Sequence, residues 1–188
     1  MTNDILNGLK VAILVTDGFE QVEMARPRRA LDDAGAQTLI VSPKADRVRA
    51  WKFGEWGDWF PVDVPLDQAK PQDFGALLLP GGLVSLDVLR NQPEAMAFAK
   101  AFFDADKPVA AICRGPWTIT EIHAAQGRRL TSCSSFQVDL RNAGADWVDE
   151  AVVVDRNLVT SRSPAEMPTF NREMIRVFSA AQKRLRAA

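Results

Sequence analysis

Cys113 is the residue whose surroundings most clearly predict chemistry. Residues 108–112 form a short apolar run typical of a buried strand, and Cys113-Arg114-Gly115-Pro116 follows before a predicted helix. A nucleophile at such a strand-to-helix bend is lifted to the edge of the sheet, where the positive end of the helix favours the thiolate. We therefore predict a reactive thiol with a lowered pKa at Cys113. The alternative is a buried structural cysteine, because the thiol packs well among apolar groups.

Two other strand ends could supply groups that act on this sulfur. The apolar run 76–79 ends in a Pro-Gly-Gly turn, and the N–H groups of Gly82 and Arg114 could form an oxyanion hole. The alternative is a plain strand-to-helix turn. Glu20 follows the first strand, and partial burial would raise the pKa of its carboxyl and let it contact the thiol. The alternative for Glu20 is an ordinary acidic residue in a first helical turn.

The remaining candidates fit structural roles better. His123 is the single histidine, and it lies near the end of the helix expected after Cys113. Ten residues of helix span about 15 Å, so we expect His123 at the surface or at the helix end. Cys133 lies among serines and fits a structural thiol. With one histidine and two cysteines that lack zinc-type spacing, the sequence predicts no metal and no cofactor.

The elements that must position these residues alternate along the chain. Apolar runs predict strands, amphipathic stripes predict helices, and a hairpin precedes a closing helix. The strands are expected at 10–16, 38–41, 76–79 and 108–112, the helices at 20–34, 93–105 and 167–185, and the hairpin at 152–155 and 158–161. This order predicts one α/β domain over residues 1–188, with a mainly parallel sheet and helices on both faces. Its site should lie beyond the carboxyl ends of neighbouring strands.

One aromatic segment does not follow this pattern. Residues 51–61 contain three of the five tryptophans of the chain, placed between charged residues and glycines. The rings could pack against the sheet edge, or they could form a subunit contact, where tryptophan is enriched. Stacking on nucleotides is disfavoured because no basic cluster surrounds the rings.

Composition excludes several classes of protein. The 188 residues carry 23 Lys plus Arg against 24 Asp plus Glu, a formal net charge of -1, so no basic field exists to bind nucleic acid or an anionic membrane. No apolar run reaches the ~20 residues of a transmembrane helix. The start, Met1-Thr2-Asn3-Asp4, lacks the features of a signal peptide. We therefore predict a cytoplasmic protein.

Five segments resemble motifs of one known family. They are DGFE at 17–20, LPGG at 79–82, AAICRGPW at 110–117, DLRNAGADWVDE at 139–150 and LVTSRSP at 158–164. Together they resemble the PfpI family, which belongs to the superfamily of the Parkinsonism-associated deglycase and the class I glutamine amidotransferase-like fold. The likeness runs from about residue 10 to residue 178. It implies a flavodoxin-like three-layer sandwich.

The resemblance also implies roles for particular residues. Cys113 matches an oxidation-prone nucleophile, Glu20 a supporting carboxyl beneath it, and Gly82 and Arg114 two main-chain donors. Members of the family commonly form dimers and sometimes hexamers, and Asp87 matches an acidic residue that reaches the neighbouring subunit's site. The activities attributed to the family are peptidase, glyoxalase and protein deglycase. The substrates implied are a small carbonyl compound or a peptide or protein, and members are often described as stress proteins.

One departure from the family pattern decides among these activities. The family has histidine after the cysteine, whereas this chain has Arg114. Arginine stays charged and cannot act as a base, and general acid–base catalysis is typically worth about 10²–10⁴ in rate. Hydrolysis of a stable amide should suffer most, and addition to a reactive carbonyl or acyl group should suffer less. The alternatives are a thiol redox sensor or stress-protective protein without turnover, and an interaction module without activity.

Overall fold

The computed structural model describes residues 5–187, so Met1–Asp4, on which the argument about a signal peptide rests, lie outside it. Within these residues, seven strands form one sheet in the order β10-β11-β7-β6-β1-β2-β5, and all neighbours are parallel except β10 and β11. The strands are β1 (Lys10–Leu14), β2 (Gln37–Ser42), β5 (Val64–Pro65), β6 (Ala76–Leu79), β7 (Val109–Ile112), β10 (Val152–Asp155) and β11 (Leu158–Ser161). The predicted hairpin at 152–161 is confirmed.

The central strands are short apolar runs because both of their faces are covered. Every residue of β6, β7 and β11 is buried, as is β1 after Lys10. Continuous burial of this kind is typical of parallel strands between two helical layers. Four of the strands expected from sequence therefore appear where their apolar runs placed them.

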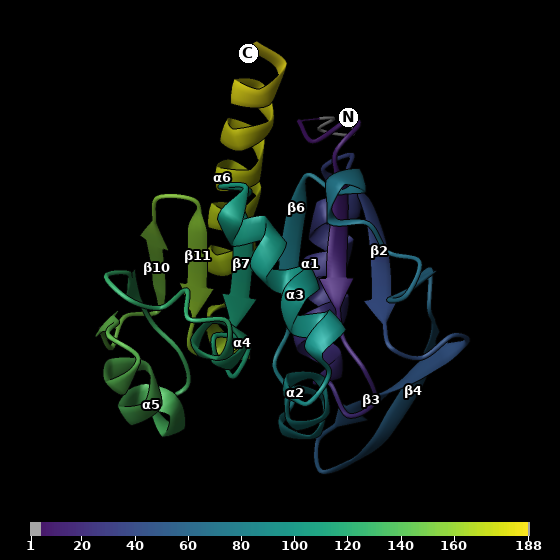
Figure 1. Ribbon diagram of the computed structural model, residues 1–188, viewed down its shortest axis with the longest axis horizontal. Coiled ribbons are helices and arrows are strands. Elements are labelled where there is room, and N and C mark those ends of the chain that lie inside the picture. The colour runs from purple at the N-terminus through teal and green to yellow at the C-terminus, as the bar shows by residue number, and fades with distance from the viewer. Residues whose placement is uncertain (1–4, 188) are drawn as a thin grey trace.

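Two layers of helices cover the sheet (Figure 1). One face carries α1 (Gln21–Asp33) and α6 (Met167–Ala187), whose Met24, Phe170 and Phe178 are fully buried. The other face carries α2 (Leu83–Arg90), α3 (Pro93–Asp104), α4 (Trp117–Glu121) and α5 (Gln137–Asn142). The predicted three-layer α/β sandwich is confirmed.

Sequence analysis did not predict α2, and it predicted a longer helix after Cys113 than the observed α4. Leu83, Val84 and Val88 of α2 are exposed while its Leu86 and Leu89 are buried, so apolar residues on two faces hide the helical stripe. The helix after Cys113 was expected to reach about residue 125, but α4 ends at Glu121. Short 3₁₀ turns lie at Pro71–Asp73, Ser134–Phe136 and Pro164–Glu166, and β8 (Arg129–Leu130) pairs with β9 (Asp146–Trp147).

The aromatic segment forms a separate antiparallel hairpin of β3 (Arg47–Lys52) and β4 (Glu55–Pro61). Trp56 and Trp59 remain about half exposed, and the tip residue Phe53 is 89% exposed. Main-chain hydrogen bonds join the hairpin to the loop after β1. Gly18 N–H donates to the Arg49 carbonyl at 2.8 Å, and Trp51 N–H donates to the Phe19 carbonyl at 2.7 Å. The hairpin therefore holds the loop that leads into α1.

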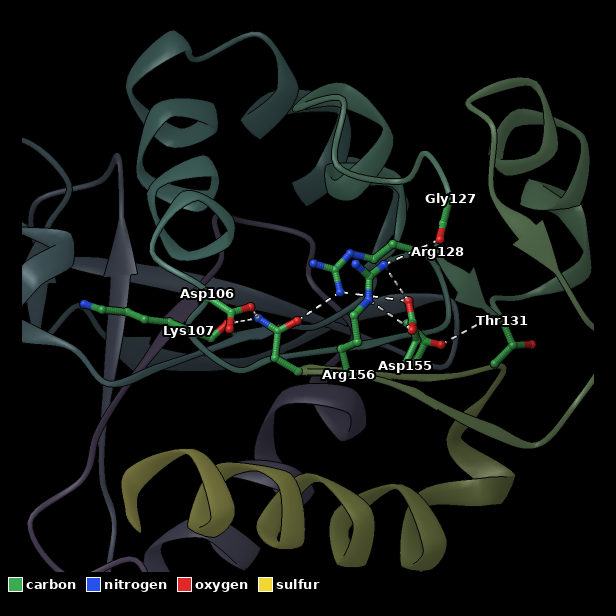
Figure 2. A network of polar contacts seen from close by, with 9 residues as sticks. Asp106, Lys107, Gly127, Arg128, Thr131, Asp155 and Arg156 are labelled. Carbon is green, nitrogen blue, oxygen red and sulfur yellow. Dashed lines mark hydrogen bonds and ion pairs between the residues drawn. The ribbon is translucent and has the colours of Figure 1, made fainter. Parts of the chain in front are cut away.

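A polar network ties the β10–β11 hairpin to the start of β7 (Figure 2). The buried Asn157 side chain donates to Asp106 Oδ1 and to the Lys107 carbonyl, both at 2.9 Å, and it accepts from Arg128 Nη1 at 2.9 Å. Asn157 lies in the connection that precedes β11, at the opposite end of that strand from Ser161. This network joins the start of β11 to the segment before β7, at the end of these strands opposite Ser161.

Within residues 5–187, no helix combines the length and the apolar composition needed to cross a bilayer.

Candidate active site

The loops after β1, β6 and β7 meet at one edge of the sheet because these three strands are neighbours. Cys113 follows β7 directly and has a φ of 58°, a left-handed conformation that a residue with a side chain adopts at a cost of about 1–3 kcal/mol. Its N–H donates to the Ser161 carbonyl at 2.8 Å, and Gly115 N–H donates to the Ile112 carbonyl at 2.8 Å. The predicted sharp bend at Cys113 is therefore present.

Glycine is required in this bend. A Cβ on Gly115 would lie 2.1 Å from the Leu79 carbonyl oxygen, which is closer than two such atoms can approach. The chain can therefore turn beneath Cys113 only because residue 115 has no side chain. The Cys113 side chain is buried, with 7% of the residue exposed.

The carboxyl group that contacts the thiol belongs to Glu23. Its side chain hydrogen-bonds with Cys113, and its Oε2 accepts from Gly81 N–H at 2.8 Å. Burial raises the pKa of Glu23 from 4.5 to about 7, although its contact with Cys113 and the hydrogen bond from Gly81 oppose the rise. A carboxyl that is half protonated near neutral pH can both accept and donate a proton at this sulfur.

Sequence analysis gave this place to Glu20, but the carboxyl beside the thiol is that of Glu23, and Glu20 lies near Arg114 and Glu23 instead. Glu20 has an extended backbone immediately before α1 and stays partly exposed, and burial raises the pKa of its carboxyl while the charge of Arg114 lowers it. Glu23 lies in the first turn of α1, on the face that buries Met24 and Leu31. A carboxylate within the apolar stripe of a helix is costly to bury, and this signal in the sequence could have identified Glu23.

Arg114 directs its side chain at the sulfur. Its Nη1 lies 3.9 Å from Cys113 Sγ and donates to it, and the side chain is partly buried. The guanidinium stays charged at any physiological pH. Arg114 therefore brings a fixed positive charge to the thiol.

The turn after β6 passes beside the main chain of Arg114. Gly82 has a φ of 118°, and a Cβ there would lie 2.5 Å from the Gly18 carbonyl oxygen. A Cβ built on Gly81 would lie 3.2 Å from Arg114 N. Within residues 5–187, neither Gly82 N–H nor Arg114 N–H donates to a protein group. An oxyanion hole formed by these two donors stays a prediction.

Cys133 contacts Cys113, a contact that sequence analysis did not predict. Cys133 N–H donates to the Cys113 carbonyl at 2.9 Å, Ser135 Oγ lies 3.3 Å from Cys133 Sγ, and the two thiols lie close enough for each to shift the pKa of the other. The hydrogen bond from Cys113 lowers the pKa of Cys133 to about 6, helped by the Ser135 hydroxyl and the charge of Arg114. No spacing rule joins residues 113 and 133, so the sequence carries no signal for this pair.

The same contact overturns the prediction of a lowered pKa for Cys113. Its hydrogen bond to Cys133, then burial and the charge of Glu23, raise the pKa of the Cys113 thiol. The helix expected to favour the thiolate has five residues and begins only at Trp117. The opposite directions of the two pKa shifts favour the proton on Cys113 and the negative charge on Cys133.

Two other predicted residues are exposed. Asp87 is exposed on α2 and His123 is exposed beyond the end of α4. Within the described part of the chain, no group of three or more His, Cys, Asp or Glu residues could hold a metal ion.

Comparison with known proteins shows the family of this chain. The model of the DJ-1/PfpI family matches residues 9–177. The chain belongs to the DJ-1/PfpI family. Membership in it suggests a cysteine-based enzyme or a stress protein.

Two bacterial relatives match this chain over nearly the whole of their own length. An uncharacterized protein of Staphylococcus saprophyticus is 43% identical over 168 residues, which are 88% of this chain and 95% of that protein. An uncharacterized protein of Staphylococcus aureus is 43% identical over 169 residues, which are 89% and 96% of the two chains.

Solved structures of the family share the fold. A two-domain protein of Anabaena variabilis, with a DJ-1/ThiJ/PfpI-like and a ferritin-like domain, is 30% identical with a TM-score of 0.83, covering 89% of this chain and 47% of that one. DJ-1 of Schizosaccharomyces pombe is 21% identical with a TM-score of 0.78, covering 94% and 98%. The second likeness concerns the fold alone.

Proposed function

We propose that this DJ-1/PfpI protein is a cysteine-dependent enzyme that acts on small reactive carbonyl compounds, with Cys113 as the nucleophile. The observation that carries the proposal is the sulfur of Cys113 at a strained bend, held between the Glu23 carboxyl and the Arg114 guanidinium. Structural cysteines need neither partner. A 2-oxoaldehyde such as methylglyoxal is the substrate class that this group suits best.

The first step is addition of the Cys113 sulfur to the aldehyde carbon. Two proton acceptors touch its thiol, the Glu23 carboxylate and the Cys133 thiolate, and either can take the proton as the carbon–sulfur bond forms. The carbonyl oxygen then becomes an oxyanion. The free N–H groups of Gly82 and Arg114 are the donors proposed to hold it.

The next step moves a proton on the resulting hemithioacetal. A carboxyl with a pKa of about 7 suits this task near neutral pH, because it can remove the proton from one carbon and return it to the next. The product is a thioester, which water hydrolyses to a 2-hydroxy acid and the free thiol. Peptide bonds are less electrophilic and need an acid for the leaving amine, so peptidase activity is the less favoured member of this proposal.

We place this chemistry in a cytoplasmic homo-oligomer. Leu83, Val84 and Val88 expose an apolar surface on α2, with 56%, 48% and 41% of each residue accessible. Burying such a surface against a second copy is favourable, since association removes apolar area from water. Asp87 lies on the same helix, which supports the prediction that it reaches the neighbouring subunit's site.

Turnover of methylglyoxal by purified variants tests the proposal. Cys113→Ser should abolish production of the hydroxy acid, and Glu23→Gln should lower kcat by about 10²-fold or more. The matched control is Glu94→Gln, which removes an exposed carboxylate from the first turn of α3 and should leave the rate unchanged. Equal rates for wild type and Cys113→Ser would end the proposal.

The second candidate is a thiol redox sensor without turnover, and the contact between the two thiols favours it. Peroxide would then oxidise Cys113 while methylglyoxal would not be consumed. Intact-mass measurement after mild peroxide treatment, followed by the turnover assay, separates the two candidates.

A further inference from the structure

We infer that Cys113 and Cys133 form a reversible intramolecular disulfide when a peroxide oxidises the site, with Cys133 as the resolving thiol. The inference rests on the proposed reactivity of Cys113, and it adds a second residue and a second activity to the same site. Neither sequence spacing nor the proposed carbonyl chemistry requires such a bond.

The main chain already holds the two residues at bonding range. The hydrogen bond from Cys133 N–H to the Cys113 carbonyl is 2.9 Å long. Standard backbone dimensions then keep the two Cα atoms no more than about 6.8 Å apart, and disulfides join Cα atoms about 4.4–6.8 Å apart. The two side chains also lie close enough for each thiol to shift the pKa of the other. The bond can therefore form by side-chain rotation without a large movement of the backbone.

The surroundings of the pair suit a resolving cysteine. Cys133 lies immediately before the 3₁₀ turn Ser134–Phe136 and is less buried than Cys113. The Ser135 hydroxyl and the charge of Arg114 both lower the pKa of the Cys133 thiol, which favours the thiolate, the form that attacks. The Arg114 guanidinium lies 3.9 Å from the Cys113 sulfur, where a cation stabilises the hydroxide that leaves.

The chemistry balances with a hydroperoxide as the oxidant. Cys113 passes its proton to an acceptor, and its sulfur attacks one peroxide oxygen, which breaks the O–O bond and leaves a sulfenic acid and a water or alcohol. Cys133 then attacks the sulfenic sulfur, the S–O bond breaks, and the hydroxide takes a proton to leave as water. Two thiols lose two electrons in total, and the peroxide gains them.

The disulfide has two consequences for the protein. It removes the nucleophile and so stops the carbonyl reaction until a dithiol reductant restores both thiols. It also consumes the sulfenic acid before a second peroxide can produce the sulfinic acid, which thiols do not reduce. The site would thus be switched off and protected in one step.

The experiment treats the reduced full-length protein with hydrogen peroxide, blocks free thiols by alkylation, and maps peptides by mass spectrometry without reduction. We expect a cross-linked peptide pair that joins residues 113 and 133 with the loss of two hydrogen atoms, and its disappearance after dithiothreitol. Methylglyoxal turnover should fall and recover in parallel. In Cys133→Ser, Cys113 should instead gain two oxygen atoms and should not recover.

Each other outcome has a definite meaning. Oxygen added at Cys113 of the wild type, with Cys133 still open to alkylation, overturns the disulfide and leaves the proposed function standing. A cross-link between two chains overturns the intramolecular assignment. A wild-type Cys113 that gains neither oxygen nor a partner overturns the disulfide and also removes the reactive thiol on which the proposed function rests. Far-UV circular dichroism of Cys133→Ser verifies that the variant folds.

Discussion

The buried carboxyl of Glu23 makes a prediction about stability that does not depend on the reaction. The folded chain raises its pKa from 4.5 to about 7, so the folded state binds the proton more tightly than the unfolded chain does. Stability from this group is therefore present below pH 4.5 and is lost as the pH rises through about 7. Replacement by glutamine keeps the shape and an oxygen that can accept from Gly81 N–H, but it removes the titration.

The size of the effect follows from the shift. A change of one pKa unit corresponds to about 1.4 kcal/mol, and integration between pH 5 and pH 8 gives about 2.5 kcal/mol for a single group with these two values. The free energy of unfolding of the wild type should thus fall by about 2.5 kcal/mol relative to Glu23→Gln over this range. The Cys133 thiol, whose pKa is lowered, contributes with the opposite sign, but it is present in both proteins and cancels in the comparison.

Urea unfolding followed by tryptophan fluorescence measures this difference at pH 5, 6, 7 and 8. The control is Glu94→Gln, an exposed carboxylate whose replacement should leave the pH dependence of the wild type intact. Parallel curves for wild type and Glu23→Gln would refute the claim that Glu23 is a buried carboxyl with a raised pKa. A difference of the opposite sign would show that the folded state prefers the carboxylate.

Four further predictions concern the backbone conformation at Gly82, the hydrogen bonds of Asn157, the charge of Arg114 and the proposed oligomer. Gly82→Ala should lower stability by about 2 kcal/mol or more, because φ is 118° and the new Cβ meets main-chain atoms at 2.5 Å; Gly127→Ala, with φ of 68° and open space, is the matched control in urea unfolding and should lose less. Asn157→Ala should lose about 1–3 kcal/mol in the same assay, since it leaves buried polar groups unpaired. Arg114→His should raise methylglyoxal turnover by about 10²-fold by restoring a base, and a fall would assign the guanidinium an active role. Leu83→Glu should convert the proposed oligomer to monomers in light scattering, and an unchanged mass would exclude α2 from the interface.

Local sequence patterns were sufficient to predict the fold and the bend that carries Cys113. The strands at 76–79 and 108–112 are continuous apolar runs bounded by turn residues, and such runs form buried parallel strands almost wherever they occur. The bend at Cys113 depends on its immediate neighbours, and Gly115 is among them. The single-domain organisation over residues 1–188 stays a prediction. In contrast, α2 escaped prediction because its outer face is apolar as well as its buried face, so that no single helical stripe can be read from its sequence.

The sequence by itself determined where the proposed nucleophile lies: a cysteine directly after an apolar strand and directly before an arginine. Tertiary structure alone decided which groups surround that sulfur. The carboxyl came from Glu23 rather than Glu20 because the direction of a side chain depends on how α1 packs on the sheet. The second thiol came from Cys133, twenty residues away, because the edge of a parallel sheet gathers segments that are distant along the chain.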